Sequence, residues 1–124
     1  MDLNPGITGT IPTSIGTSLT TLGGFLFGFN SMQGTIPSEL GGLGTALINL
    51  IGEFNSLTGT VPSELALLGS AQRIFLDGNP GMSGTVPFEL CVNSNVGNLE
   101  LELVCSICEI PDPVFGNCCD NPCP

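Results

Sequence analysis

The sequence contains no histidine, lysine, tyrosine or tryptophan, and Arg73 is its single basic residue. Nucleophilic mechanisms that depend on a Ser-His pair or on an activated lysine are therefore excluded. Binding to nucleic acid or to an anionic membrane surface requires clustered cations, so both are excluded as direct partners. Paired carboxylates are the acid–base chemistry that remains, and we expect the protein not to be an enzyme.

Targeting and membrane-spanning segments are also absent from the sequence. Met1 is followed by polar and turn residues rather than by the basic and apolar regions of a signal peptide. The apolar stretch at residues 43–51 is far shorter than a bilayer span and is interrupted by polar residues. We therefore expect no direct membrane span, and the sequence indicates no cofactor.

Acidic and apolar residues are abundant instead. The chain carries eleven Asp and Glu, a formal net charge of −10, and 41% hydrophobic against 10% charged residues. This hydrophobic content exceeds that of disordered chains, and the length fits one domain. The acidic excess favours basic partners or cations, although its most common role is to keep a protein soluble.

A repeat of 25 residues organises the chain. The motif Gly-Thr-(Ile/Val)-Pro occurs at residues 9–12, 34–37, 59–62 and 84–87. An Asn precedes each copy, at Asn4, Asn30, Asn55 and Asn79. Three copies are followed by an acid that should form a solvated outer column: Glu39, Glu64 and Glu89. A fixed period of this length is the signature of a solenoid, in which no repeat buries its apolar face alone.

Short apolar alternations before each Asn predict one strand per repeat. The predicted inward residues are Phe25, Phe27, Leu50, Ile74 and Leu76, and residues 99–103 repeat the alternation one period later. Gly52 is an exception, because it stands where an inward apolar residue is expected. Each repeat thus predicts a strand, an Asn turn, the Gly-Thr motif and a loosely helical or extended return leg.

These motifs resemble the plant-type leucine-rich repeat over residues 1–104, with about four repeats of which the first is partial. Residues 57–65 and the Cys-rich tail are also similar to secreted leucine-rich-repeat proteins of diatoms and algae, and the repeats to plant polygalacturonase-inhibitor-like domains. The resemblance implies an α/β repeat solenoid, a right-handed superhelix with short parallel strands on its concave side. It also implies an Asn ladder, in which each amide satisfies backbone groups of its own and the next repeat.

The cysteines gather in the last third of the chain, at Cys91, Cys105, Cys108, Cys118, Cys119 and Cys123. An even, clustered set favours disulfides and an extracellular or cell-surface location, with an oxidising organelle lumen as the alternative. Residues 105–124 are predicted to form a C-terminal cap. The pairing stays open: Cys91 with Cys105 or Cys108 is one hypothesis, and zinc held by four thiolates is a weaker one. We assign no metal.

The N-terminal end shows no comparable cap, because the chain begins in the middle of a repeat. Terminal repeats need a cap to cover their apolar layer. We expect either that residues precede Met1 in the complete protein or that a partner covers this end.

Outward residues of the predicted strands define the candidate binding surface. One predicted column runs through Leu26, Ile51, Phe75 and Glu100, and the next through Gly28, Glu53, Asp77 and Glu102. An exposed apolar stripe flanked by acid usually marks an interaction site. The predicted partner-binding residues are Leu26, Ile51, Glu53, Arg73, Phe75, Asp77 and Glu100.

Phe29 and Phe54 stand directly before their Asn, with Gly78 and Leu103 as the equivalent residues. The sequence leaves open whether the two rings join the binding surface or turn inward.

A protein-interaction module that uses its concave surface is the function favoured by these features. The partner is expected to be another protein, in a transient or a permanent complex, and a glycan ligand stays open. A small structural subunit of a larger assembly is one alternative. Ice binding is the other, because Thr-x-Thr pairs recur at strand spacing: Thr8 with Thr10 and Thr58 with Thr60 are complete, and Gln33 with Thr35 and Ser83 with Thr85 are partial.

Overall fold

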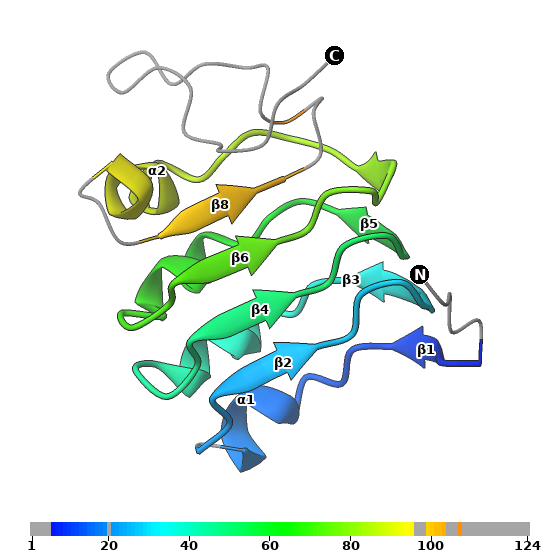
Figure 1. The fold of residues 1–124 in the computed structure, drawn as a ribbon, viewed down its shortest axis with the longest axis horizontal. Helices are drawn as coiled ribbons and strands as arrows, with labels where there is room; N and C mark the ends of the chain where they lie inside the picture. The colour runs from blue at the N-terminus through cyan, green and yellow to red at the C-terminus, as the bar shows by residue number, and fades with distance from the viewer. Residues whose placement is uncertain (1–5, 20, 96–98, 104–106, 108–124) are drawn as a thin grey trace.

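The computed structural model describes residues 6–19, 21–95, 99–103 and 107. The chain winds into stacked coils (Figure 1), and two parallel four-stranded sheets run along the stack. The front sheet has the order β2 (Gly24–Leu26), β4 (Asn49–Ile51), β6 (Arg73–Phe75) and β8 (Glu100–Glu102). The side sheet has the order β1 (Thr8–Thr10), β3 (Ser31–Thr35), β5 (Ser56–Gly59) and β7 (Gly81–Met82). The α/β repeat solenoid predicted from the sequence is confirmed.

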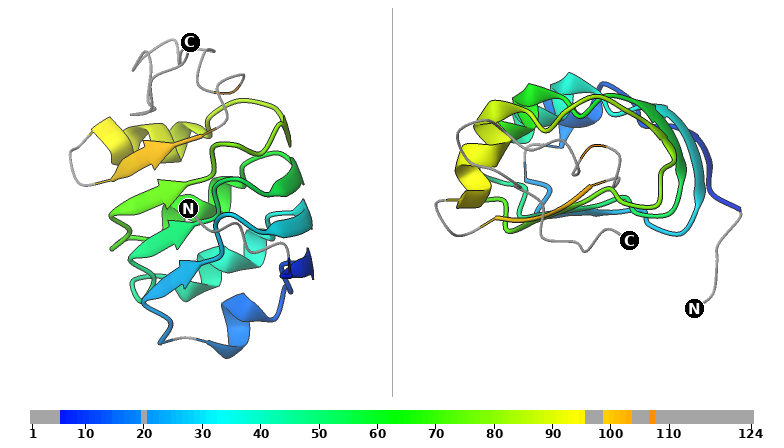
Figure 2. Two further views of the ribbon diagram at one scale, coloured as in Figure 1. Left: turned by 45° about the vertical axis from the view of Figure 1, so that its right-hand side comes forward. Right: turned by 90° about the horizontal axis from the view of Figure 1, so that it is seen from above.

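Short helices complete each coil on the side away from the front sheet (Figure 2). They are α1 (Ile15–Ser18), the 3₁₀ helices η1 (Ser38–Leu43) and η2 (Ser63–Leu67), and α2 (Phe88–Asn95). The predicted return legs are therefore helical. No helix among the described residues is both long and apolar enough to cross a membrane.

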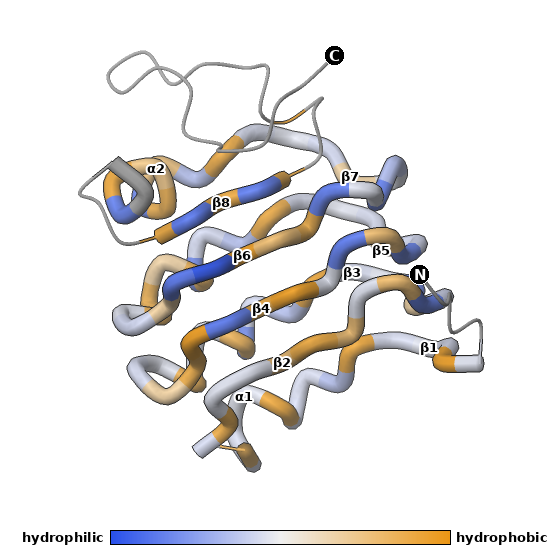
Figure 3. Tube along the Cα trace, in the orientation of Figure 1, coloured by the Kyte–Doolittle hydropathy of each residue, from blue (hydrophilic) through white to orange (hydrophobic). Residues whose placement is uncertain are grey.

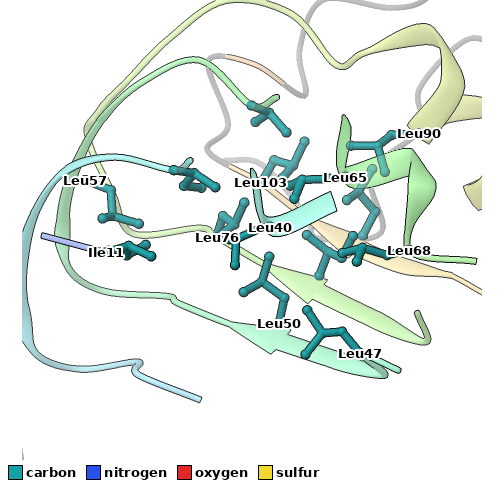
Figure 4. Close-up of a cluster of buried hydrophobic side chains, with 14 of the residues drawn as sticks. Ile11, Leu40, Leu47, Leu50, Leu57, Leu65, Leu68, Leu76, Leu90 and Leu103 are labelled. Carbon is teal, nitrogen blue, oxygen red and sulfur yellow. The ribbon is translucent and has the colours of Figure 1, made fainter. Parts of the chain in front are cut away.

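The core is a continuous column of aliphatic side chains enclosed by the coils (Figure 4). One apolar residue of each helical leg points into it: Ile15, Leu40, Leu65 and Leu90. The front sheet contributes the predicted inward positions, and Leu50, Ile74 and Leu101 are almost completely buried there. Stacking thus buries the apolar face that a single repeat would expose.

The predicted Asn ladder is confirmed for Asn55 and Asn79. The Asn79 amide donates to the carbonyl of Leu76 at 2.9 Å and to that of Gly52, in the preceding repeat, at 3.0 Å. Its Oδ1 accepts from the Leu57 amide at 3.1 Å. Asn55 makes the equivalent bonds one coil earlier. The ladder therefore joins each turn to the preceding coil rather than to the next one.

Gly52 is accommodated by the side chain of the preceding coil. The Phe27 ring fills the space that the missing side chain leaves, because a Cβ on Gly52 would lie only 2.7 Å from Cε2 of that ring. Phe27 is itself 6% exposed and belongs to the core. A large residue and a glycine thus share the volume that two aliphatic residues occupy elsewhere.

The side sheet was not predicted from the sequence. Its strands contain at most one buried apolar position each, such as Met32 and Leu57, so no apolar alternation marks them. The glycine of each Gly-Thr motif adopts a left-handed conformation, with φ between 79° and 97° at Gly9, Gly34, Gly59 and Gly84. Glycine adopts this conformation without a Cβ penalty, which explains its recurrence.

The front-sheet register corrects the last repeat. Leu26 pairs with Ile51 and Ile51 with Phe75 as predicted, but Phe75 pairs with Glu102 rather than with Glu100. Helix α2 is longer than the legs before it, so the β6 to β8 connection exceeds the regular period. For the same reason Leu103 lies in the core and is not equivalent to Phe29 and Phe54.

The predicted cap at residues 105–124 falls largely outside the described residues. Ile107 is an exception and lies fully buried in the core. Cys91, in α2, is buried and disulfide-bonded. The other five cysteines lie outside the described residues, so their pairing and the zinc alternative stay predictions, as does the domain boundary at residue 104.

Candidate functional site

An apolar row crosses the front sheet on its solvent side. Leu26, Ile51 and Phe75 follow one another in register on β2, β4 and β6. Leu26 is 69% exposed, the highest value among the large apolar residues described. The hydropathy colouring is apolar along β2 and over most of β4 and β6, whereas β8 is polar at both ends (Figure 3). The row therefore changes from apolar to acidic along the stack, ending at Glu102.

A polar row runs beside it. Arg73 pairs in register with Asn49 on one side and Glu100 on the other. The Arg73 Nε lies 3.4 Å from Glu100 Oε2, and both side chains are about half exposed. Such exposed ion pairs contribute little to stability, so this pair is better placed to orient the two side chains at the surface.

Three carboxylates meet at the end of the apolar row, where Glu102 lies close to two acids from the other margin. Oxygens of Glu53, Asp77 and Glu102 all lie within 4.8 Å of one another, and each side chain is half-buried. We call these residues the acidic triad. Oδ1 of Asp77 is buried and accepts no hydrogen bond in the structure. Glu53 and Asp77 belong to the predicted site, whereas Glu102 was placed in their column but left out of the predicted set.

Burial and mutual repulsion perturb two members of the triad. Burial raises the pKa of Glu53, and the neighbouring Asp77 carboxylate raises it further. Burial also raises the pKa of Asp77, against the opposing effect of a hydrogen bond from its own backbone. Both shifts mean that the folded surroundings disfavour the ionised forms of Glu53 and Asp77. A cation placed between these oxygens would relieve that cost.

Replacing Glu53 by Gln should stabilise the protein at neutral pH. Because the folded-state pKa is raised, the folded protein binds more protons than the unfolded chain between the ordinary and the raised pKa, so wild-type stability falls as pH rises through that window. We expect a gain of about 0.2–1 kcal/mol near pH 7 that vanishes below the ordinary Glu pKa. Urea unfolding at both pH values measures it. Glu64→Gln, on the outer surface, is the control, and an equal gain there would contradict the prediction.

Phe29 and Phe54 lie at the end of the strands beside the triad, and neither turns into the core. Both adopt a left-handed backbone conformation, with φ of 57° and 53°, which is unusual for a bulky residue. Their rings stack at 4.7 Å, and Phe54 is 48% exposed. Gly78 continues the series with φ of 69°, and a Cβ there would collide with the Phe54 ring. The stacked rings therefore extend the apolar surface next to the carboxylates.

The hydroxyl residues of the Thr-x-Thr pairs lie in the strands of the side sheet or shortly after them, and they are exposed. In the side sheet, residues that pair on neighbouring strands are not separated by the 25-residue period of the motif. Thr10 pairs with Gln33, and Thr35 pairs with Thr58. The columns predicted for an ice-binding face are therefore displaced in register, and Gln33 and Gly81 interrupt them. A shallow groove of about 1270 Å³ follows the Gly-Thr motifs of successive coils.

The acidic triad is the group of described residues that could share a cation. Calcium takes six to eight oxygen ligands. Three carboxylates that each contribute a single oxygen do not supply that many. A Lys or Arg side chain needs fewer acceptors and forms short charge-assisted hydrogen bonds with carboxylates. The geometry thus suits a cationic group from a partner at one end of an apolar row.

Comparisons with known proteins place the fold. No protein-family model and no curated protein matches the sequence. The plant peptide hormone receptor RGFR1, in complex with RGF2, is 25% identical with a TM-score of 0.66; the match covers 82% of this chain and 19% of the receptor chain. The Arabidopsis receptor kinase HAESA ectodomain, in complex with an IDA peptide hormone ligand, is 33% identical with a TM-score of 0.68, covering 78% and 16%.

A plant ice-binding protein is similar to the same extent, with 27% identity and a TM-score of 0.69 over 82% of this chain and 31% of that one. The chain spans less than a third of the length of each of these three proteins. The same family is indicated by the repeat motif, the two-sheet coil, the Asn ladder and the structural neighbours. The chain is a plant-type leucine-rich-repeat protein.

Proposed function

We propose that the protein is a non-catalytic recognition module that binds an extracellular protein or peptide on its front sheet. The observation that carries the proposal is the solvent-side row of Leu26, which is exposed, and of Ile51 and Phe75, which are half-buried. This row ends at the acidic triad. Exposed apolar patches rimmed by polar residues are typical of interaction sites. Support also comes from RGFR1, a plant peptide hormone receptor in complex with RGF2, and from the HAESA leucine-rich-repeat ectodomain in complex with a peptide hormone ligand.

Charge identifies the kind of partner. The protein has a net charge of −10, and its only cation, Arg73, contacts Glu100. An acidic partner would be repelled, whereas a basic one would be steered towards the surface. The expected ligand therefore presents an apolar segment for the row and a Lys or Arg for the triad, with the Phe29–Phe54 stack available for contact with the cation.

Substituting Ser for both Ile51 and Phe75 should weaken partner binding by about 30-fold or more, because truncating each apolar anchor costs about 1 kcal/mol or more. The partner is first isolated from the native source by affinity capture, and its Kd is then measured by titration calorimetry. Circular dichroism establishes that the variant is folded.

A charge variant, Glu53→Gln with Asp77→Asn, separates the role of the triad. The variant removes two negative charges and, with them, the repulsion within the triad. Because the Lys or Arg of the partner then loses its attraction to these charges, affinity should fall and should depend less on salt concentration. Ser38→Ala, on the outer surface, is the matched control. Unchanged affinity in both front-sheet variants would exclude this surface.

Two alternatives stay predictions. A permanent structural subunit would use the same surface and differ only in the lifetime of the complex. Ice binding is favoured by the exposed hydroxyls of the side sheet and by the similarity to a plant ice-binding protein. The displaced register weakens it, and normal ice-crystal growth in the presence of the protein would exclude it.

A further inference from the structure

The outer surface breaks the repeat pattern at one place, between η2 and α2. The position held by Phe88 in the last coil is Thr13, Ser38 and Ser63 in the earlier ones. The position held by Leu67 is Thr17 and Gly42 in the two coils before it. Leu67 is 64% and Phe88 52% exposed. Two large apolar side chains thus replace small or polar ones on a solvent-facing surface.

A change in backbone packing opens space beside them. In the earlier coils Gly16 and Gly41 allow adjacent legs to pack backbone against backbone, since a Cβ on Gly41 would lie 2.5 Å from the Glu64 carbonyl oxygen. The next coil has Ala66 at this position. Its Cβ prevents the same close approach, so η2 and α2 cannot pack as tightly as η1 and η2 do.

The result is a groove of about 560 Å³ that is lined by Ala66, Leu67, Phe88 and Val92, with Glu64 and Glu89 among its lining residues. Both acids are exposed. Arg73, the only basic side chain, lies on the front sheet and contacts Glu100, so no basic side chain balances them.

We propose that this groove is a second docking surface, for an amphipathic segment of another protein that inserts apolar side chains between Leu67 and Phe88 and places Lys or Arg opposite Glu64 and Glu89. Helix-in-groove recognition uses this combination of apolar anchors and flanking charge. A second copy of this chain is disfavoured as the occupant, because it would bring acids against acids. The surface lies on the side of the coils away from the front sheet, so both could be occupied together.

Fluorescence anisotropy with synthetic peptides tests the proposal. The probe is a labelled amphipathic helix of Leu and Lys, compared with a scrambled peptide of the same composition and with a Leu and Glu version. Tight binding by the first peptide only is the expected result. Equal binding of the scrambled or the acidic peptide would overturn the proposal.

Variants locate the site. Leu67→Ser with Phe88→Ser should weaken binding about tenfold or more, and Glu64→Gln with Glu89→Gln should weaken it severalfold and reduce its salt dependence. Both apolar positions hold Ser, Thr or Gly in earlier coils, so the substitutions suit the fold. Leu19→Ser, an exposed apolar change that belongs neither to the groove nor to the front-sheet row, should leave binding within about twofold. An equal loss in that control, or no loss in the groove variants, would refute the groove as the site.

Two further measurements distinguish the proposed partner from other possible occupants of the groove. Sedimentation equilibrium should show a monomer, and self-association that Phe88→Ser abolishes would assign the groove to a second copy instead. Thermal unfolding should change little in Phe88→Ser. A large fall in Tm with unchanged peptide binding would mean that the chain itself packs on this surface. Front-sheet variants that lose their partner but keep the peptide would separate this site from the first one.

Discussion

Replacing Asn79 by Ala should lower the free energy of unfolding by about 3 kcal/mol, because buried backbone groups that lose their partner each cost about 1–3 kcal/mol. The Asn79 side chain is fully buried and bonds the Leu57 amide and the Leu76 carbonyl. Urea unfolding monitored by circular dichroism measures the loss.

Asn30→Ala is the matched control, since Asn30 occupies the same position two coils earlier. Its amide donates to the carbonyls of Phe27 and Gly28, but its Oδ1 accepts nothing in the structure. The Phe27 carbonyl also receives the Asn55 amide. We therefore expect a loss of only about 1 kcal/mol. Equal losses at the two positions would show that the ladder bonds do not join the coils as described.

The second large effect concerns the shared volume of Phe27 and Gly52. Phe27→Ala should cost about 3–5 kcal/mol, because it empties the space that the ring fills beside a residue without a side chain. Gly52→Ala should cost about 1–3 kcal/mol, because its Cβ meets the ring. The two changes together should be less harmful than their sum by more than about 1 kcal/mol.

A double-mutant cycle at Phe25 is the control for this coupling. The Phe25 ring contacts that of Phe27, at 4.5 Å between centroids, but it is not among the atoms nearest Gly52. Phe25→Ala and Gly52→Ala should therefore combine additively within about 0.5 kcal/mol. Additivity in the Phe27 cycle as well would contradict the packing described.

Periodicity made the main features of the fold predictable. The repeated Asn, the Gly-Thr motif and the apolar alternation each report a backbone requirement that recurs in every coil, so their spacing predicts strands, turns and ladder together. The side sheet escaped prediction because Ser31–Thr35 and its counterparts pair mainly through backbone groups. Only the hydroxyl alternation around the motif could have indicated it.

The candidate site was predictable only where the period is constant. Leu26, Ile51 and Phe75 fell into their register, but helix α2 lengthened the last coil and moved Glu102 to the place expected for Glu100. The left-handed conformation of Phe29 and Phe54 had no sequence signal, because bulky residues seldom adopt it. The outer groove did have a sequence signal. When the repeats are aligned, Leu67 and Phe88 stand at positions that hold small or polar residues in the earlier coils.

Site-specific photo-crosslinking tests the central claim, that the front sheet is the recognition surface. A photo-reactive phenylalanine analogue is placed at Phe75 in one variant and at the exposed Ser38 of the outer surface in another. After irradiation with the isolated partner, mass spectrometry should find the partner joined to position 75 and absent from position 38. Crosslinks at position 38 without any at position 75 would contradict the claim.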